Sequence, residues 1–216
     1  MHRGTSALAA SALIVGLSAC GAGGGDDESS SSSQEPTSID AALLECGEVT
    51  DDDPTLQLPD IDLTAATWDT PDGFVETFEY SEDLPVEHIE SFWVAEPKDG
   101  PTPLNVLTVV VYSELDWGEE IDECGRVPRT AVDSRLEGYH EHNGAEPLTK
   151  VSDAEVGGLP ALEQQVVLPE YSYEGFWLFS RDQLLHVYCQ WTSQEEKARV
   201  LKGCDDLVAS VVVPGA

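Results

Sequence analysis

The last third of the chain carries the pattern that most limits the fold, because it predicts two β-hairpins in succession. Residues 150–156 and 161–168 flank the turn sequence GGLP, and residues 173–180 and 183–191 flank the pair RD. Strand-like runs separated by a few turn residues are typical of antiparallel hairpins. We therefore expect four consecutive antiparallel strands in this part of the chain.

A helix is predicted to follow the last of these strands directly. Thr192 or Ser193 can cap its amino end, with Glu195 and Glu196 at capping-box spacing. The apolar residues of this segment recur at helical spacing and form one stripe: Val200, Cys204, Leu207, Val208 and Val211. Because only a turn separates the helix from the strand, the helix should fold back across the sheet.

The preceding part of the chain predicts a mixture of strands and helices. The expected elements are a short helix at 39–46, strands at 64–69, 74–80, 87–95 and 105–112, and a helix at 130–142. Residues 105–112 are β-branched and apolar on both faces, which indicates a central strand that is covered on both sides. The whole layout predicts an α+β fold, with a largely antiparallel sheet and helices packed on it.

The first residues have the layout of a secretory signal. Arg3 precedes a weakly apolar run at residues 7–17, which is too short to span a bilayer as a helix. The sequence Leu17-Ser18-Ala19-Cys20 resembles the bacterial lipobox, in which the cysteine is acylated and becomes the first mature residue. We therefore predict a signal peptide at residues 1–19 and lipidation at Cys20; the alternative is a plain signal peptide with an incidental cysteine.

The segment after Cys20 predicts a flexible tether. Residues 20–38 are rich in glycine, serine and acidic residues, and cannot bury enough apolar surface to fold. The expected organisation is therefore a lipidated tether at 20–38 and a single domain at 39–216. Two acyl chains anchor a protein stably to a bilayer, so we expect the chain on the extracytoplasmic face of the cell membrane.

The remaining cysteines predict two disulfides, because an even number in an extracytoplasmic domain favours pairing. Cys189 shares a strand face with apolar neighbours, and Cys204 lies on the packing stripe of the last helix. We therefore predict Cys189–Cys204, which leaves Cys46–Cys124. Zinc is the rival use of these residues, but no C-x-x-C pair occurs and His186 is the only histidine close to a cysteine in sequence.

The chain is strongly acidic, with 42 Asp and Glu against 10 Lys and Arg and a net charge of −32. Removal of the signal segment takes away Arg3 and no acid, so the mature chain would carry −33. Nucleic acid is not an expected partner, because binding it requires Lys and Arg to neutralise phosphates. A basic partner or divalent cations could use this acidity, although a solvated acidic surface is the favoured interpretation.

No catalytic motif is present, and neither an enzymatic activity nor a cofactor is expected. The chain has no G-x-S-x-G, P-loop or H-E-x-x-H sequence. His140 and His142 are candidate metal ligands, but two residues of spacing on a helix points them in different directions. Handling of a solute or of Ca²⁺ or Zn²⁺ remains the alternative to a binding module.

One strand face offers a candidate pocket. His186 and Tyr188 alternate with Cys189 and therefore point away from the face that packs on the last helix. If no helix covers their side fully, these residues would line a shallow pocket for a protein or small-molecule ligand.

Four short sequences in this chain resemble those of a known family. They are PDGF between two predicted strands, GGLPALEQQ, LLHVYCQW and, near the end of the last helix, LVASV. The pattern is similar to the PsbP-like lipoproteins of actinobacteria, of the LpqN type, over most of residues 60–213. The resemblance implies an antiparallel sheet sandwiched by helices and a non-enzymatic binding or accessory module; it brings no catalytic residues.

Overall fold

An eight-stranded sheet forms the centre of the computed structural model, which describes residues 54–101 and 103–216. Every strand pairing in this sheet is antiparallel. Seven strands follow one another across the sheet in the order β2 (Phe74–Thr77), β3 (His88–Pro97), β4 (Val106–Ser113), β10 (Leu184–Trp191), β9 (Ser172–Phe179), β8 (Leu159–Val167) and β6 (Glu146–Pro147). The eighth, β7 (Ser152–Val156), also pairs with β8.

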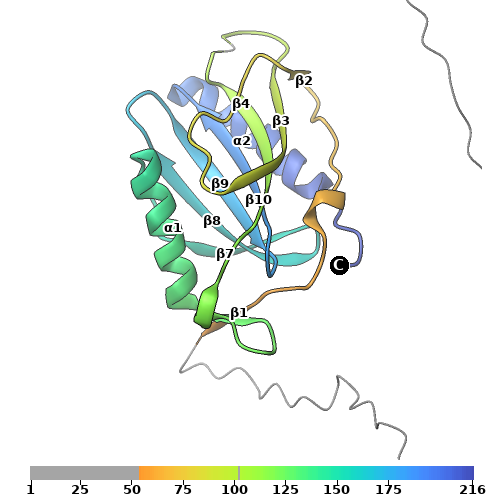
Figure 1. The fold of residues 1–216 in the computed structure, drawn as a ribbon. Helices are drawn as coiled ribbons and strands as arrows, with labels where there is room; N and C mark the ends of the chain where they lie inside the picture. Colours follow the sequence, from red (N-terminus) through yellow and green to blue (C-terminus); the bar gives the residue numbers. More distant parts are fainter. Residues whose placement is uncertain (1–53, 102) are drawn as a thin grey trace, which may run out of the picture. The chain divides into compact units, whose positions relative to one another are not determined.

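Two helices cover opposite faces of the sheet, α1 (Arg129–Asn143) and α2 (Gln194–Ser210). Figure 1 shows α2 behind the sheet and α1 on the near face. The buried apolar residues accordingly form two clusters, one between the sheet and α2 and one between the sheet and α1. The predicted α+β fold with an antiparallel sheet and helices packed on it is therefore confirmed.

The predicted central strand is confirmed in β4, which lies between β3 and β10. Seven of its eight residues are buried. Leu107, Val109 and Val111 belong to the cluster under α2, whereas Val110 and Tyr112 belong to the cluster under α1. An apolar, β-branched strand is needed here because both of its faces are removed from water.

One end of each helix follows a local signal in the sequence. The Ser193 side chain accepts a hydrogen bond from the Glu196 amide and caps the amino end of α2. α1 ends at Gly144, whose φ of 68° lies in the left-handed region that glycine tolerates. A single short turn between β10 and α2 then directs the helix back across β10 and β4.

The disulfide between Cys189 and Cys204 is confirmed, and it joins β10 to α2 with a Cα–Cα distance of 5.8 Å. Both residues are fully buried. Cys124 is also disulfide-bonded. Its expected partner Cys46 lies outside the described residues, so the Cys46–Cys124 pairing stays a prediction.

Two strand predictions need correction. Residues 64–69 do not form a strand, because the Asp62 side chain accepts hydrogen bonds from the Thr64 amide and hydroxyl and closes a 3-10 turn at Leu63–Ala65. Only Thr67 pairs, in a single bridge to Val212. The strand expected at 74–80 ends at Thr77, where the chain leaves the sheet.

Four further short elements were not expected from the sequence. They are β1 (Thr55–Gln57), which pairs with β5 (Arg126–Pro128), the edge strand β6 and a 3-10 turn at Gly118–Glu120. Runs of two or three residues are too short to show a period in sequence.

The predicted signal peptide, the lipidation of Cys20, the tether and the 39–46 helix fall outside the described residues. Within the part of the chain that the structure describes, no helix has the length and apolar character needed to cross a bilayer.

Candidate functional site

The face of β10 opposite Cys189 carries His186 and Tyr188, the two residues predicted to line a pocket. The antiparallel register places His186 beside Trp177 of β9, and Tyr188 beside Gly175 of β9 and Thr108 of β4. The structure therefore places both predicted residues in the middle of the sheet, on the side that α1 covers.

Aromatic rings pack tightly around His186. Its ring stacks on Trp177 with centroids 4.9 Å apart, and it lies 4.9 Å from the ring of Tyr188. Tyr173 lies 5.6 Å from Tyr188. Gly175 makes this packing possible, because a Cβ at that position would lie 2.6 Å from the Trp177 ring.

Residues 78–87, which we call the cover segment, connect β2 to β3 across this aromatic cluster. Figure 1 shows the segment on the same face of the sheet as α1. The Tyr188 hydroxyl donates a hydrogen bond of 2.7 Å to the Glu82 carboxylate. At the far end, Arg135 and Tyr139 of α1 each donate to Glu87 at 2.6 Å. These contacts hold the segment over the sheet.

A cavity of two adjoining compartments lies beneath the cover segment, and we call it the tyrosine cavity. The outer compartment has a volume of about 230 Å³ and the inner one about 40 Å³. Five residues line both compartments: Glu82, Asn143, Leu168, Tyr171 and Tyr188. His186, Tyr173 and Tyr112 line the inner compartment.

Two polar atoms in the walls of the inner compartment are buried without a hydrogen-bond partner, His186 Nε2 and Asn143 Oδ1. His186 is only 8% exposed. A buried polar atom that lacks a partner costs about 1–3 kcal/mol, so native proteins rarely retain one without a ligand, a water or a function. The inner compartment is large enough to hold a water molecule or a small polar group beside these atoms.

Burial shifts the pKa of two ionisable side chains in the walls of the cavity. Burial, with a smaller effect from His140, lowers the pKa of His186 to about 3, so the ring is neutral near pH 7. Burial also raises the pKa of Glu82 above its usual value, although the hydrogen bond from Tyr188 opposes that shift.

Glu82 influences every tyrosine of the inner compartment. Burial is the largest cause that raises the pKa of the phenols of Tyr112, Tyr171, Tyr173 and Tyr188, and the negative charge of Glu82 adds to it in all four. The cavity therefore has a negative electrostatic character that centres on one carboxylate.

His140 and His142 do not form a site together. His140 is buried, and its ring meets Trp177 edge-on at 6.1 Å, whereas His142 is exposed. Burial lowers the pKa of His140. Among residues 54–101 and 103–216, no group of three or more His, Cys, Asp or Glu side chains is arranged to hold a metal ion.

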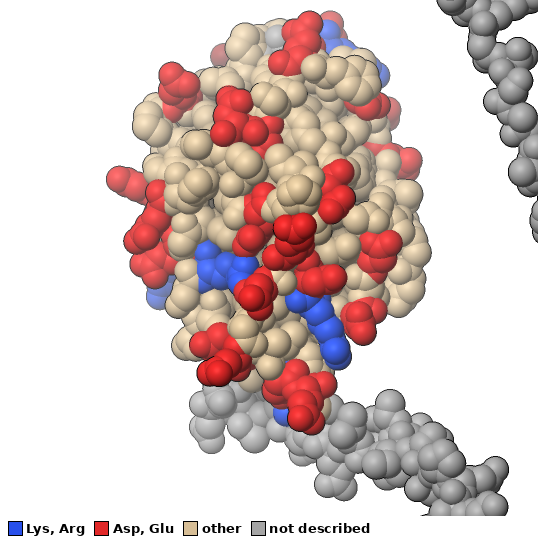
Figure 2. Space-filling model, in the orientation of Figure 1, with Lys and Arg blue, Asp and Glu red and all other residues tan. Residues whose placement is uncertain are grey.

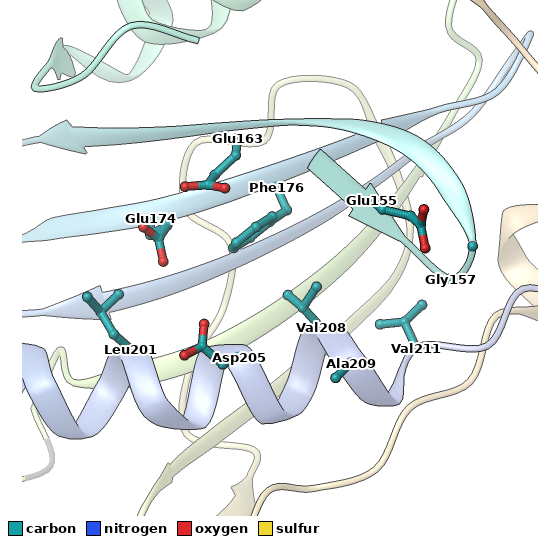
Figure 3. Close-up of a pocket in the computed structure, with 11 residues that line it drawn as sticks. Glu155, Gly157, Glu163, Glu174, Phe176, Leu201, Asp205, Val208, Ala209 and Val211 are labelled. Carbon is teal, nitrogen blue, oxygen red and sulfur yellow. The ribbon is translucent and has the colours of Figure 1, made fainter. Parts of the chain in front are cut away.

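A second hollow, of about 600 Å³, lies between α2 and strands β7 to β9, and we call it the α2 groove. Figure 3 shows Glu163, Glu174 and Phe176 of the sheet facing Leu201 and Asp205 of α2. Burial raises the pKa of Glu163, and the charges of Glu174 and Asp205 raise it further.

The α2 groove differs from the tyrosine cavity in its buried polar atoms. None of the described side-chain atoms that are buried without a partner belongs to a residue lining the groove. Among its described lining residues, the α2 groove therefore has no buried side-chain polar atom that needs a hydrogen bond from a ligand. The tyrosine cavity is the better candidate site for this reason.

The remaining residues of the tyrosine cavity, above all Glu82, Asn143 and Tyr171, were not predicted from the sequence. They lie on the cover segment, at the end of α1 and in the β8–β9 turn, so no sequence period connects them to β10. The one available signal was Gly175, because a glycine inside a strand often marks a close approach of neighbouring groups.

Comparisons with known proteins give a likeness in fold and none in sequence family. No protein-family model and no curated protein sequence matches the chain. Among solved structures, the fold is similar to cyanobacterial PsbP (CyanoP) from Synechocystis sp. PCC 6803, at 14% identity and a TM-score of 0.44, over 80% of this chain and 99% of that chain.

Proposed function

We propose that this chain is a lipid-anchored protein of the extracytoplasmic face of the cell membrane, whose domain binds a small ligand in the tyrosine cavity without catalysis. The observation that carries the proposal is the pair of buried atoms without partners, His186 Nε2 and Asn143 Oδ1, in the wall of one cavity. A ligand would supply hydrogen-bond partners for both atoms, and a water molecule would do so in the absence of the ligand.

The size of the cavity favours a compact ligand. Sites for drug-sized molecules have volumes of about 300–1,000 Å³. The outer compartment, at about 230 Å³, is smaller than this range, and the inner one adds little to it. The aromatic walls supply the apolar surface that such sites use, and the few polar atoms would orient the ligand.

The proposal of binding without catalysis is supported by the sequence, which carries none of the motifs of nucleophilic or zinc-dependent hydrolysis. The lipobox and tether support the anchored location, and with the quoted sequence likeness they also support a relationship to the LpqN type of lipoprotein. Such a protein would present its ligand, or a protein partner, close to the membrane.

Nucleic acid is not proposed as a partner. In Figure 2, carboxylate residues are spread over the whole face in view, and Lys and Arg are confined to a few small groups. A surface of this kind repels phosphates, because it lacks the basic stripe on which such binding depends.

The lipid anchor is tested by Cys20→Ser. We expect the wild-type protein from its native host to carry the mass of acyl groups on Cys20 and to partition into the detergent phase, because two acyl chains hold a protein firmly in lipid. The variant should lose both the mass and the partition. A wild-type protein with a free, unacylated amino end would contradict this part of the proposal.

The binding site is tested by filling each hollow with the same side chain. We expect Leu168→Trp, in the wall of the tyrosine cavity, to abolish ligand-observed NMR signals of compact molecules that bind the full chain. Leu201→Trp, in the α2 groove, is the matched control and should retain them. The reverse pattern would place binding in the α2 groove and refute the proposed site.

A further inference from the structure

We propose that the outer compartment of the tyrosine cavity binds a compact organic cation of the alkylammonium class. The inference rests on the proposed function, because it names the chemistry of a ligand for the same cavity. It follows from the walls of the compartment, their charge and the buried atoms beside them.

Aromatic side chains form much of the wall of the outer compartment: Tyr80, Phe92, Tyr171 and Tyr188. The faces of such rings carry partial negative charge and attract a cation within about 6 Å, an interaction used to recognise alkylammonium groups. A neutral apolar ligand would also fit against these rings, so the charge of the compartment decides between the two classes.

The charge of the outer compartment is negative. Glu82, Asp83 and Glu170 line it, and no Lys or Arg is among its lining residues. Glu82 is half-buried, and within the described part of the chain no salt bridge neutralises it. Its only described side-chain partner is the neutral hydroxyl of Tyr188. A cation stabilises a partly desolvated carboxylate that has no counter-ion, whereas an anion is repelled by it.

The buried atoms at the back of the cavity fit the same class of ligand. Asn143 lines both compartments, and its unpartnered Oδ1 is a hydrogen-bond acceptor. The neutral His186, whose Nε2 also lacks a partner, lines the inner compartment and adds no positive charge. A hydroxyl or amine on the cation would donate to Asn143 Oδ1, whereas a carboxylate or phosphate would face this acceptor and the acidic side chains of the outer compartment.

Choline and neohexyl alcohol provide a direct test, because the two molecules have the same shape and differ by the replacement of the charged nitrogen with carbon. We expect the full chain carrying Cys20→Ser to bind choline at least tenfold more tightly than neohexyl alcohol in NMR titrations. A partly buried charge pair is worth about a factor of ten. Phosphocholine should bind more weakly than choline, which separates a free cation from a lipid headgroup as the source.

Glu82→Gln should weaken choline binding about tenfold and leave the binding of neohexyl alcohol unchanged. Glu163→Gln, the same substitution in the α2 groove, is the control for general loss of negative charge and should bind choline like the unmodified chain. Tyr171→Leu should also weaken the binding of choline more than the binding of neohexyl alcohol. This second variant keeps the test valid if Glu82→Gln is poorly folded.

Equal affinities for choline and neohexyl alcohol would overturn the cation inference and leave the proposed function intact. Loss of choline binding in Glu163→Gln to the same extent as in Glu82→Gln would also overturn it. If neither molecule shifts resonances of the cavity residues, the cation inference fails, and the tryptophan-filling variants decide the proposed function separately.

Discussion

Replacement of both Cys189 and Cys204 by alanine is expected to lower the free energy of unfolding by about 3 kcal/mol. The bridge closes a loop with a sequence separation of 15 residues, and on the chain-entropy model a loop of that size restricts the unfolded chain by about this amount. Both sulfurs are fully buried, so the smaller alanines also leave a cavity between β10 and α2. Urea unfolding at equilibrium measures the difference.

The volume of the lost sulfur atoms is controlled by a second double variant, Cys189→Val with Cys204→Ala. Valine restores apolar volume on β10, so the remaining difference in the free energy of unfolding between this variant and the wild type reports the cross-link alone. A loss of 3 kcal/mol is a large share of the 5–15 kcal/mol that holds a typical domain folded. A double alanine variant as stable as the wild type would show that packing alone holds α2 on the sheet.

Acid should destabilise the protein through His186. Burial lowers the pKa of this ring to about 3 in the folded state, against an ordinary value of 6.5 in the unfolded chain. Between these two values the unfolded state binds one more proton, so stability is complete above pH 6.5 and is lost as the pH falls towards 3. The loss amounts to about 1.4 kcal/mol for each pH unit well inside this window.

His186→Phe isolates this effect, because phenylalanine keeps a ring on Trp177 and removes the titrating group. Between pH 6 and pH 4.5 the wild type should lose about 2 kcal/mol more stability than the variant. Burial lowers the pKa of His140 and raises that of Glu82, and both groups remain in the two proteins, so their effects cancel in the comparison.

The measurement is urea unfolding over this pH range. His142→Phe, which replaces an exposed imidazole, is the control and should follow the wild type. Equal pH dependence in the wild type and in His186→Phe would mean that the ring at position 186 is accessible to protons in the folded state. The cavity would then be open to water at its inner end, contrary to the burial of Nε2.

The strands and helices of the last third could be predicted from sequence because each depends on local patterns. Gly157 and Gly158 form the turn between β7 and β8, and Ser193 caps α2. Just before this region, Gly144 ends α1 with a positive φ. The disulfide Cys189–Cys204 also followed from local periods, since a strand of period two and a helix of period 3.6 each point one cysteine at the same interface.

The region before β3 resisted the same reasoning because side chains there override the local pattern. Asp62 closes a turn where a strand was expected, and the chain leaves the sheet after Thr77 to form the cover segment. Hydrogen bonds to residues far along the chain hold that segment, with Glu82 joined to Tyr188 and Glu87 joined to Arg135. No window of sequence contains both partners of such a contact.

By itself, the sequence determined the antiparallel α+β layout, the central strand β4, the cap and stripe of α2 and the direction in which His186 and Tyr188 point. Only the tertiary structure decided that these two residues line one cavity with Glu82, Asn143 and Tyr171. The physical reason is the distance along the chain over which each signal acts. Periodicity and capping act within a few residues, whereas a cavity forms where separate segments pack and leave polar atoms without partners.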